Sequence, residues 1–87
     1  MGKSIPLELN PAIEIEIEAA PIATALGLAQ EDFLRLLALR KIDQLCERGI
    51  DADTGLYRAS FYHGTKRARV VVDRQGHFVG DVELRSR

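Results

Sequence analysis

The chain has 87 residues, which leaves room for one hydrophobic core but not for a second domain. Apolar residues make up 46% and charged residues 29% of the sequence, a globular composition that excludes a wholly disordered chain. The net charge of −1 hides an uneven distribution, because residues 1–34 carry one lysine against six acidic residues and residues 35–87 carry eleven basic against seven acidic residues. Either the two halves neutralise each other inside one fold, or each offers a charged face to a partner.

The sequence also predicts the compartment. No apolar run is long enough to span a bilayer, and the first residues have no apolar core of a signal peptide. The single cysteine, Cys46, cannot form an internal disulfide, which is typical of a reducing environment. We therefore expect a cytoplasmic protein with one domain over residues 1–87, in which residues 1–12 could form a flexible arm and residues 85–87 fray.

The first half predicts a strand followed by two helices. Isoleucines and glutamates alternate over residues 13–18, which is the period of a strand with one buried and one acidic face. Alternation extends back to Ile5, so two strand pieces hinged at Asn10-Pro11 are the alternative. A short helix is expected over residues 21–26, and a longer one, rich in leucine, over residues 31–41.

From residue 43 onward the pattern predicts strands and tight turns. Strand-length segments run over residues 43–48, 56–63, 66–73 and 77–84. Gly64-Thr65 suits a two-residue hairpin loop, and residues 74–76 suit a three-residue loop. The two loops fix the register, and both place the same face of residues 66–73 inward. We therefore expect an α+β domain in which the helices pack on one face of an antiparallel β-meander of three to four strands.

The meander carries most of the candidate binding residues. Basic side chains beside an aromatic ring can hold phosphate and stack a base, which suggests nucleic-acid or anion binding by Arg58, Tyr62, Lys66, Arg67, Arg69 and Arg74. The predicted register, however, places Asp81 beside Arg69 and Glu83 beside Arg67. Such cross-strand pairs are ordinary on a solvated sheet, so the alternative is a neutralised outer face without a ligand.

Other candidate sites are weaker. Cys46 could be a redox-sensing thiol, but no base lies beside it in the sequence, and a small buried side chain is the alternative. We expect no metal site, because His63 and His77 fall at opposite ends of the meander. Residues 51–55 resemble a calcium loop only in their first positions, so we expect a polar turn there. The two helices resemble a winged helix-turn-helix, but its recognition helix would begin at Glu31 and turn a carboxylate toward the DNA, which disfavours that function.

Several stretches resemble a family of small bacterial proteins that is known only as a domain of unknown function. These are Leu45-Cys46-Glu47-Arg48-Gly49, Gly55–Arg58, Phe61–His63 and Arg67–Asp73. The resemblance covers roughly residues 13–80 and implies a bacterial, cytoplasmic protein, but it brings no activity, cofactor or catalytic residue with it.

The sequence contains no convincing catalytic constellation, and we expect neither an enzyme nor a cofactor. It therefore favours a non-enzymatic binding or regulatory module that acts through its surface on a protein partner. Because a core this small gains from self-association, a homodimer through an exposed edge of residues 13–18 is a further expectation.

Overall fold

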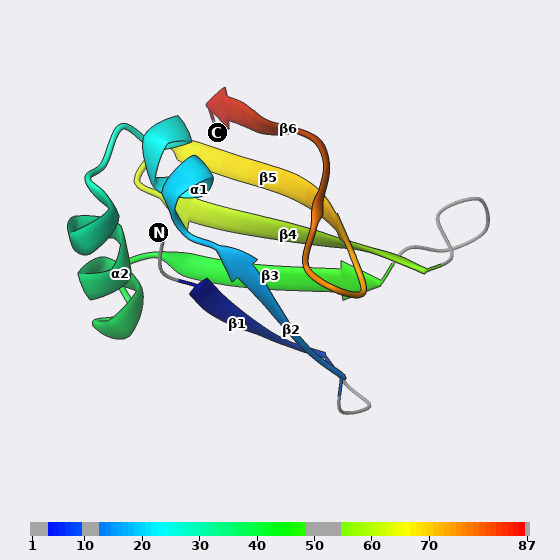
Figure 1. Ribbon diagram of the computed structural model, residues 1–87. Coiled ribbons are helices and arrows are strands. Elements are labelled where there is room, and N and C mark those ends of the chain that lie inside the picture. Colours follow the sequence, from blue (N-terminus) through cyan, green and yellow to red (C-terminus); the bar gives the residue numbers. More distant parts are fainter. Residues whose placement is uncertain (1–3, 10–12, 49–54, 87) are drawn as a thin grey trace.

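The computed structural model describes residues 4–9, 13–48 and 55–86, and these form six strands and two helices (Figure 1). In chain order the elements are β1 (Ser4–Leu9), β2 (Ile13–Glu18), α1 (Ala20–Ala25), α2 (Gln30–Ala38), β3 (Asp43–Arg48), β4 (Leu56–His63), β5 (Lys66–Asp73) and β6 (Phe78–Ser86). The predicted α+β class and order of elements are confirmed. The polar turn predicted over residues 51–55 falls mostly outside the described residues.

The strands form two antiparallel sheets. β1 and β2 pair as a hairpin. The alternating N-terminal segment therefore forms two strands, which was the alternative to a single strand over residues 13–18. β3, β4, β5 and β6 form a four-stranded meander in sequence order. The hairpin and α1 lie on the same side of this meander, and α2 packs at one end of it (Figure 1). Among the described elements, no helix lies on the opposite side of the meander, which we call the outer face.

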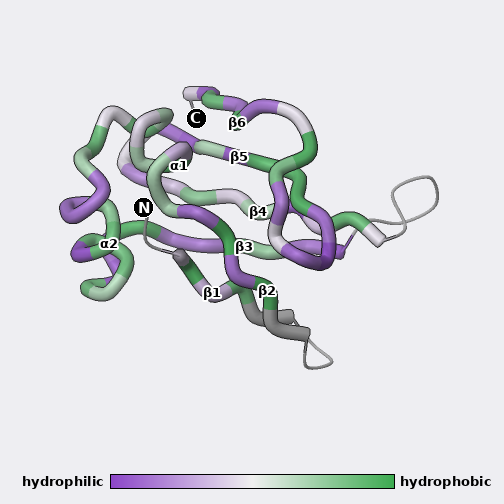
Figure 2. The backbone as a smooth tube through the Cα atoms, viewed as in Figure 1, coloured by the Kyte–Doolittle hydropathy of each residue, from purple (hydrophilic) through white to green (hydrophobic). Residues whose placement is uncertain are grey.

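The core lies between the hairpin, the helices and the inner face of the meander. Alternation places Ile5, Leu7, Ile15 and Ile17 of the hairpin inward, and all four are buried. The inner face of the meander supplies Tyr57, Ala59, Phe61, Ala68, Val70 and Val72. Along β5 the chain passes from mostly hydrophilic residues to a hydrophobic stretch (Figure 2). Phe33 of α2 closes one end of this core, with its ring edge-on to Phe61 at 5.7 Å.

Both helices end in the same backbone motif. In α1, Leu28 N–H donates to the Ala23 carbonyl and Gly27 N–H to the Thr24 carbonyl, with Gly27 at a φ of 74°. In α2 the corresponding bonds end the helix at Ala38, three residues before the predicted end. The left-handed position there is filled by Arg40, at a φ of 59°, the one non-glycine residue with positive φ in the described part of the chain.

The register of the meander confirms the first predicted hairpin and corrects the second. β4 and β5 pair as expected from a Gly64-Thr65 loop, with Tyr57 opposite Val72 and His63 opposite Lys66. β5 and β6 start in the predicted register, with Val72 opposite Phe78. Beyond Val71 the ladder then shifts, and Arg69 faces Glu83 instead of the predicted Asp81.

The cause of the shift is a bulge on β6. Gly80 adopts a φ of 86°, which the regular strand does not allow, and two extra residues of β6 are taken up between Val79 and Glu83. Because the shift is an even number of residues, each side chain of β6 beyond the bulge keeps its face. The predicted inward face of β5 and the outer pair Val71–Val79 are therefore correct, whereas Arg69 faces Glu83 and Arg67 faces Arg85. The Glu83 carboxylate nevertheless lies 3.5 Å from Arg67, its predicted neighbour. Among the described helices, neither has the length and apolar character needed to cross a membrane.

Candidate surface on the outer face of the meander

The outer face is built from three rows of cross-strand neighbours. Each row crosses β3, β4, β5 and β6 in that order, and the rows are Asp43–Tyr62–Arg67–Arg85, Leu45–Ser60–Arg69–Glu83 and Glu47–Arg58–Val71–Val79. Strand alternation alone brings these side chains together, because every second residue of each strand points to this side. The face thus combines four arginines with two glutamates, one aspartate and several aliphatic side chains.

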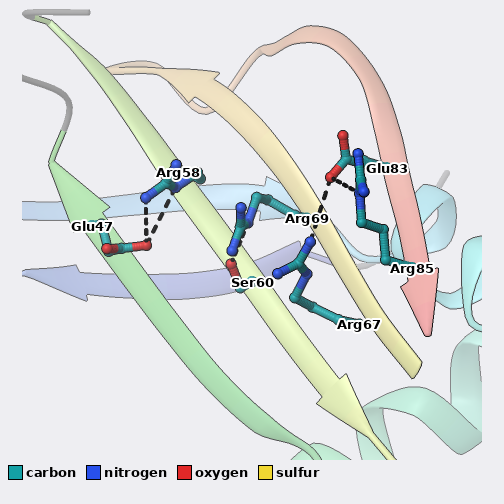
Figure 3. A network of polar contacts seen from close by, with 7 residues as sticks. All are labelled: Glu47, Arg58, Ser60, Arg67, Arg69, Glu83 and Arg85. Atoms are coloured by element: carbon teal, nitrogen blue, oxygen red, sulfur yellow. Dashed lines mark hydrogen bonds and ion pairs between the residues drawn. The ribbon is translucent and has the colours of Figure 1, made fainter. Parts of the chain in front are cut away.

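The arginines make hydrogen bonds and ion pairs that differ in length and in partner (Figure 3). Arg58 donates to one carboxylate oxygen of Glu47 from Nε at 3.2 Å and from Nη2 at 3.1 Å. Arg85 donates to Glu83 at 3.0 Å, whereas Arg67 lies 3.5 Å from the same carboxylate oxygen. Arg69 donates from Nε to the hydroxyl of Ser60 at 3.1 Å. The exposed pairs of Arg58 and Arg85 contribute about 0.2–1 kcal/mol each, so these two arginines can exchange partners at little cost.

Two arginine groups on this face keep unused hydrogen-bonding capacity. Within the described part of the chain, no carboxylate lies within 4.0 Å of the Arg69 guanidinium. The Nε of Arg67 is buried, and no acceptor among the described residues reaches it. A buried donor without an acceptor is unfavourable, so both groups would gain from an anion placed beside them.

The structure brings together four of the six predicted binding residues. Arg58, Tyr62, Arg67 and Arg69 share the outer face. Lys66 alternates to the other side, where its Nζ lies beside Gly27 at the end of α1. Arg74 is exposed in the turn after β5, at the end of the sheet.

Sequence reasoning did not assign the β3 residues Asp43, Leu45 and Glu47 to this surface, and it missed Arg85 and Ser60 as binding residues. Arg85 was placed beyond the last strand, but β6 continues to Ser86 and carries it onto the face. Ser60 is fully buried beneath the arginines although it points outward. The signal for Ser60 was its cross-strand position opposite Arg69, which the predicted register already contained.

Cys46 does not lie on the outer face. It is half-buried on the inner side of β3, opposite Ala59. Burial raises the pKa of the Cys46 thiol, the neighbouring charge of Glu47 raises it further, and Arg48 lowers it. A reactive thiol requires a lowered pKa, so this environment favours the packing role over the redox role.

The histidines lie apart, as the meander requires. His63 ends β4, and His77 lies in the turn before β6, where its Nδ1 is 3.3 Å from Asp73. The backbone N–H of His77 and then that of Gln75 lower the pKa of Asp73, which accepts a hydrogen bond from each. In the ranges 4–9, 13–48 and 55–86, no three potential metal ligands gather at one place.

One groove lies away from the outer face. It has a volume of about 520 Å³ and runs between β1, the end of α2 and the start of β3. Ile5, Leu34, Leu37 and Ile42 give it apolar walls, and Arg40 is its charged lining residue. The groove is open to solvent, and its lining contains no group of catalytic residues.

The predicted edge for a homodimer is partly covered. β2 pairs with β1 along one edge. On its other side the backbone of Gly76, in the turn between β5 and β6, lies directly against the carbonyl of Glu16. Self-association through residues 13–18 stays a prediction, and it would have to leave this contact in place or displace it.

Comparison with known proteins gives a family but no activity. No curated protein and no solved structure gives a significant match to the chain. The model of a family of unknown function, DUF6522, matches residues 6–86, which include all the strands and helices described above except for the first two residues of β1. The chain therefore belongs to the DUF6522 family of unknown function.

Proposed function

We propose that this protein is a non-enzymatic binding module that recognises an acidic protein partner through the outer face of its meander. The observation that carries the proposal is the gathering of four arginines on a sheet face without helices, where two carboxylates pair with them. We also propose that it acts in the bacterial cytoplasm, which its lone cysteine supports.

The apolar side chains on the same face favour a protein partner. Leu45 on β3 is 46% exposed and Val79 on β6 is 47% exposed, and both lie in the same rows as the arginines or next to them. Arginine and exposed aliphatic groups together are typical of protein–protein interfaces, in which a buried centre is surrounded by a polar rim. An acidic segment with apolar residues between its carboxylates would complement this surface.

Nucleic acid is the second candidate, because Arg58, Arg67 and Arg69 could contact phosphates. One feature weighs against it. Tyr62 is the one aromatic residue among the outer-face rows, which limits base stacking.

The experiment compares two labelled probes by fluorescence anisotropy at low salt. One is a poly-glutamate peptide, and the other is a mixed-sequence single-stranded oligonucleotide. We expect the peptide to bind the wild-type protein more tightly, and we expect Arg58→Ala combined with Arg69→Ala to weaken that binding by about tenfold or more. Lys66→Ala combined with Arg74→Ala is the matched control, because it removes two charges as well and both residues are exposed but lie off this face. An equal loss in the control, or no binding of the peptide, would contradict the proposal.

A further inference from the structure

We infer that Arg67, Arg69 and Ser60 form a carboxylate-binding subsite, and that Glu83 competes for this subsite in the free protein. The ligand class is the side-chain carboxylate of an aspartate or glutamate from the acidic partner. The inference rests on the proposed function and deepens it, because it assigns one position on the outer face at which an acidic side chain binds.

The subsite begins with the register of β4 and β5. Ser60 faces Arg69 directly, and Arg67 is two residues away on the same face of β5. The two arginine side chains are therefore neighbours along one strand. Figure 3 shows the Arg69 guanidinium on Ser60, and the Arg67 guanidinium turned between Ser60 and Glu83.

The fixed geometry of these groups favours an anion. Ser60 is buried and accepts the Nε–H of Arg69, which orients that guanidinium and leaves its Nη donors available. The Arg67 side chain is only 22% exposed, so its guanidinium is already held close to the sheet. A planar guanidinium held in place loses little conformational entropy when it binds a carboxylate with two parallel hydrogen bonds.

The buried Nε of Arg67 is the second, independent observation. This donor has no acceptor in the part of the chain that the structure describes. Protein atoms cover this donor, so a carboxylate that enters between the arginines reaches it only when the Arg67 side chain turns away from Glu83, and the carboxylate then supplies the acceptor that the donor lacks. Binding would thus satisfy a group that is unfavourable in the free protein.

Glu83 stands at the edge of the subsite as an internal competitor. Its carboxylate lies 3.5 Å from Arg67 Nη2, which is an ion-pair distance, whereas Arg85 donates a hydrogen bond to the same oxygen at 3.0 Å. Glu83 therefore neutralises Arg67 without binding it well, and Arg85 can retain Glu83 when an incoming carboxylate takes its place. Removing the charge of Glu83 should make the subsite more attractive to an acidic partner.

The experiment measures poly-glutamate binding to two variants that change the net charge equally. Glu83→Gln removes the competitor, and Asp81→Asn removes an exposed carboxylate of β6 that makes no ion pair within the described residues. We expect Glu83→Gln to tighten binding by about threefold or more, and Asp81→Asn by less than about twofold. Nitrogen-15 NMR of the wild-type protein should show a shift of the Arg67 Nε–H resonance when the peptide is added.

The outcomes separate this inference from the proposed function. In one outcome the peptide binds, the double variant Arg58→Ala with Arg69→Ala weakens that binding, and Glu83→Gln has the same effect as Asp81→Asn. The outer face then binds acidic partners, but the subsite is refuted. A shift of the Arg67 Nε–H with the oligonucleotide and not with the peptide would make the ligand a phosphate and overturn the assignment. If the peptide does not bind the wild-type protein, both proposals fall.

Discussion

Replacing Gly76 with alanine tests how the two sheets are joined. Gly76 lies in the turn between β5 and β6 at a φ of 86°, and its backbone rests on β2. A Cβ at this position would lie 3.0 Å from the carbonyl carbon of Glu16 and well inside contact distance of the carbonyl oxygen. Because that oxygen belongs to the backbone of a core strand, no flexible side chain can move aside to make room.

The expected loss has two parts that a matched control separates. Alanine in the left-handed region costs about 1–2 kcal/mol, and the reduced entropy of the unfolded chain returns about 0.4–1 kcal/mol. Gly80→Ala carries this cost alone, because Gly80 has the same φ of 86° and nothing within 4 Å of its Cβ position. Gly76→Ala adds an overpacking cost of about 1–3 kcal/mol, which brings its expected loss to about 2–4 kcal/mol.

The assay is urea unfolding followed by far-ultraviolet circular dichroism. With a slope of about 1 kcal/mol per molar urea for a chain of this size, the midpoint should fall by about 1 M in Gly80→Ala and by about 2 M or more in Gly76→Ala. Equal losses in the two variants would refute the reasoning, because they would mean that the turn does not rest on β2.

Two further predictions concern single residues elsewhere. Arg40→Gly should stabilise the protein by about 0.5–1 kcal/mol, because glycine relieves the left-handed strain at the end of α2, and a thermal midpoint that falls would contradict this. Cys46 should react with a thiol reagent at least about tenfold more slowly in the native protein than in urea, since burial raises its pKa; equal rates would instead support a reactive thiol.

The fold was largely predictable because the signals are local. Alternation identified the strands, and the Gly64-Thr65 loop fixed every pairing between β4 and β5. The β6 register failed beyond Val79 because a turn controls only the pairs near it, and a bulge can intervene further along. Gly80, a glycine in the middle of a strand, was the signal that could have revealed the bulge.

The candidate surface was harder to predict than the fold. The arginines of β4 and β5 were placed on one face by alternation, and Lys66 could have been separated from them by the same parity. The β6 residues that face Arg67 and Arg69 depended on the register after the bulge, which the turn could not supply. Side-chain partners such as Ser60 depend on rotamers and burial, and these follow only from the assembled sheet.

The order of the strands has a consequence for how the chain folds during its synthesis. Every ladder joins strands that are neighbours in sequence, so each can close as soon as its two strands have left the ribosome. The hairpin of β1 and β2 emerges first, and the inner face of the meander that covers its isoleucines is made last. Until then Ile15 and Ile17 are exposed on a strand that could associate with other chains. Glu16 and Glu18, which alternate with them, place charge on that strand and oppose its aggregation while the rest of the fold is completed.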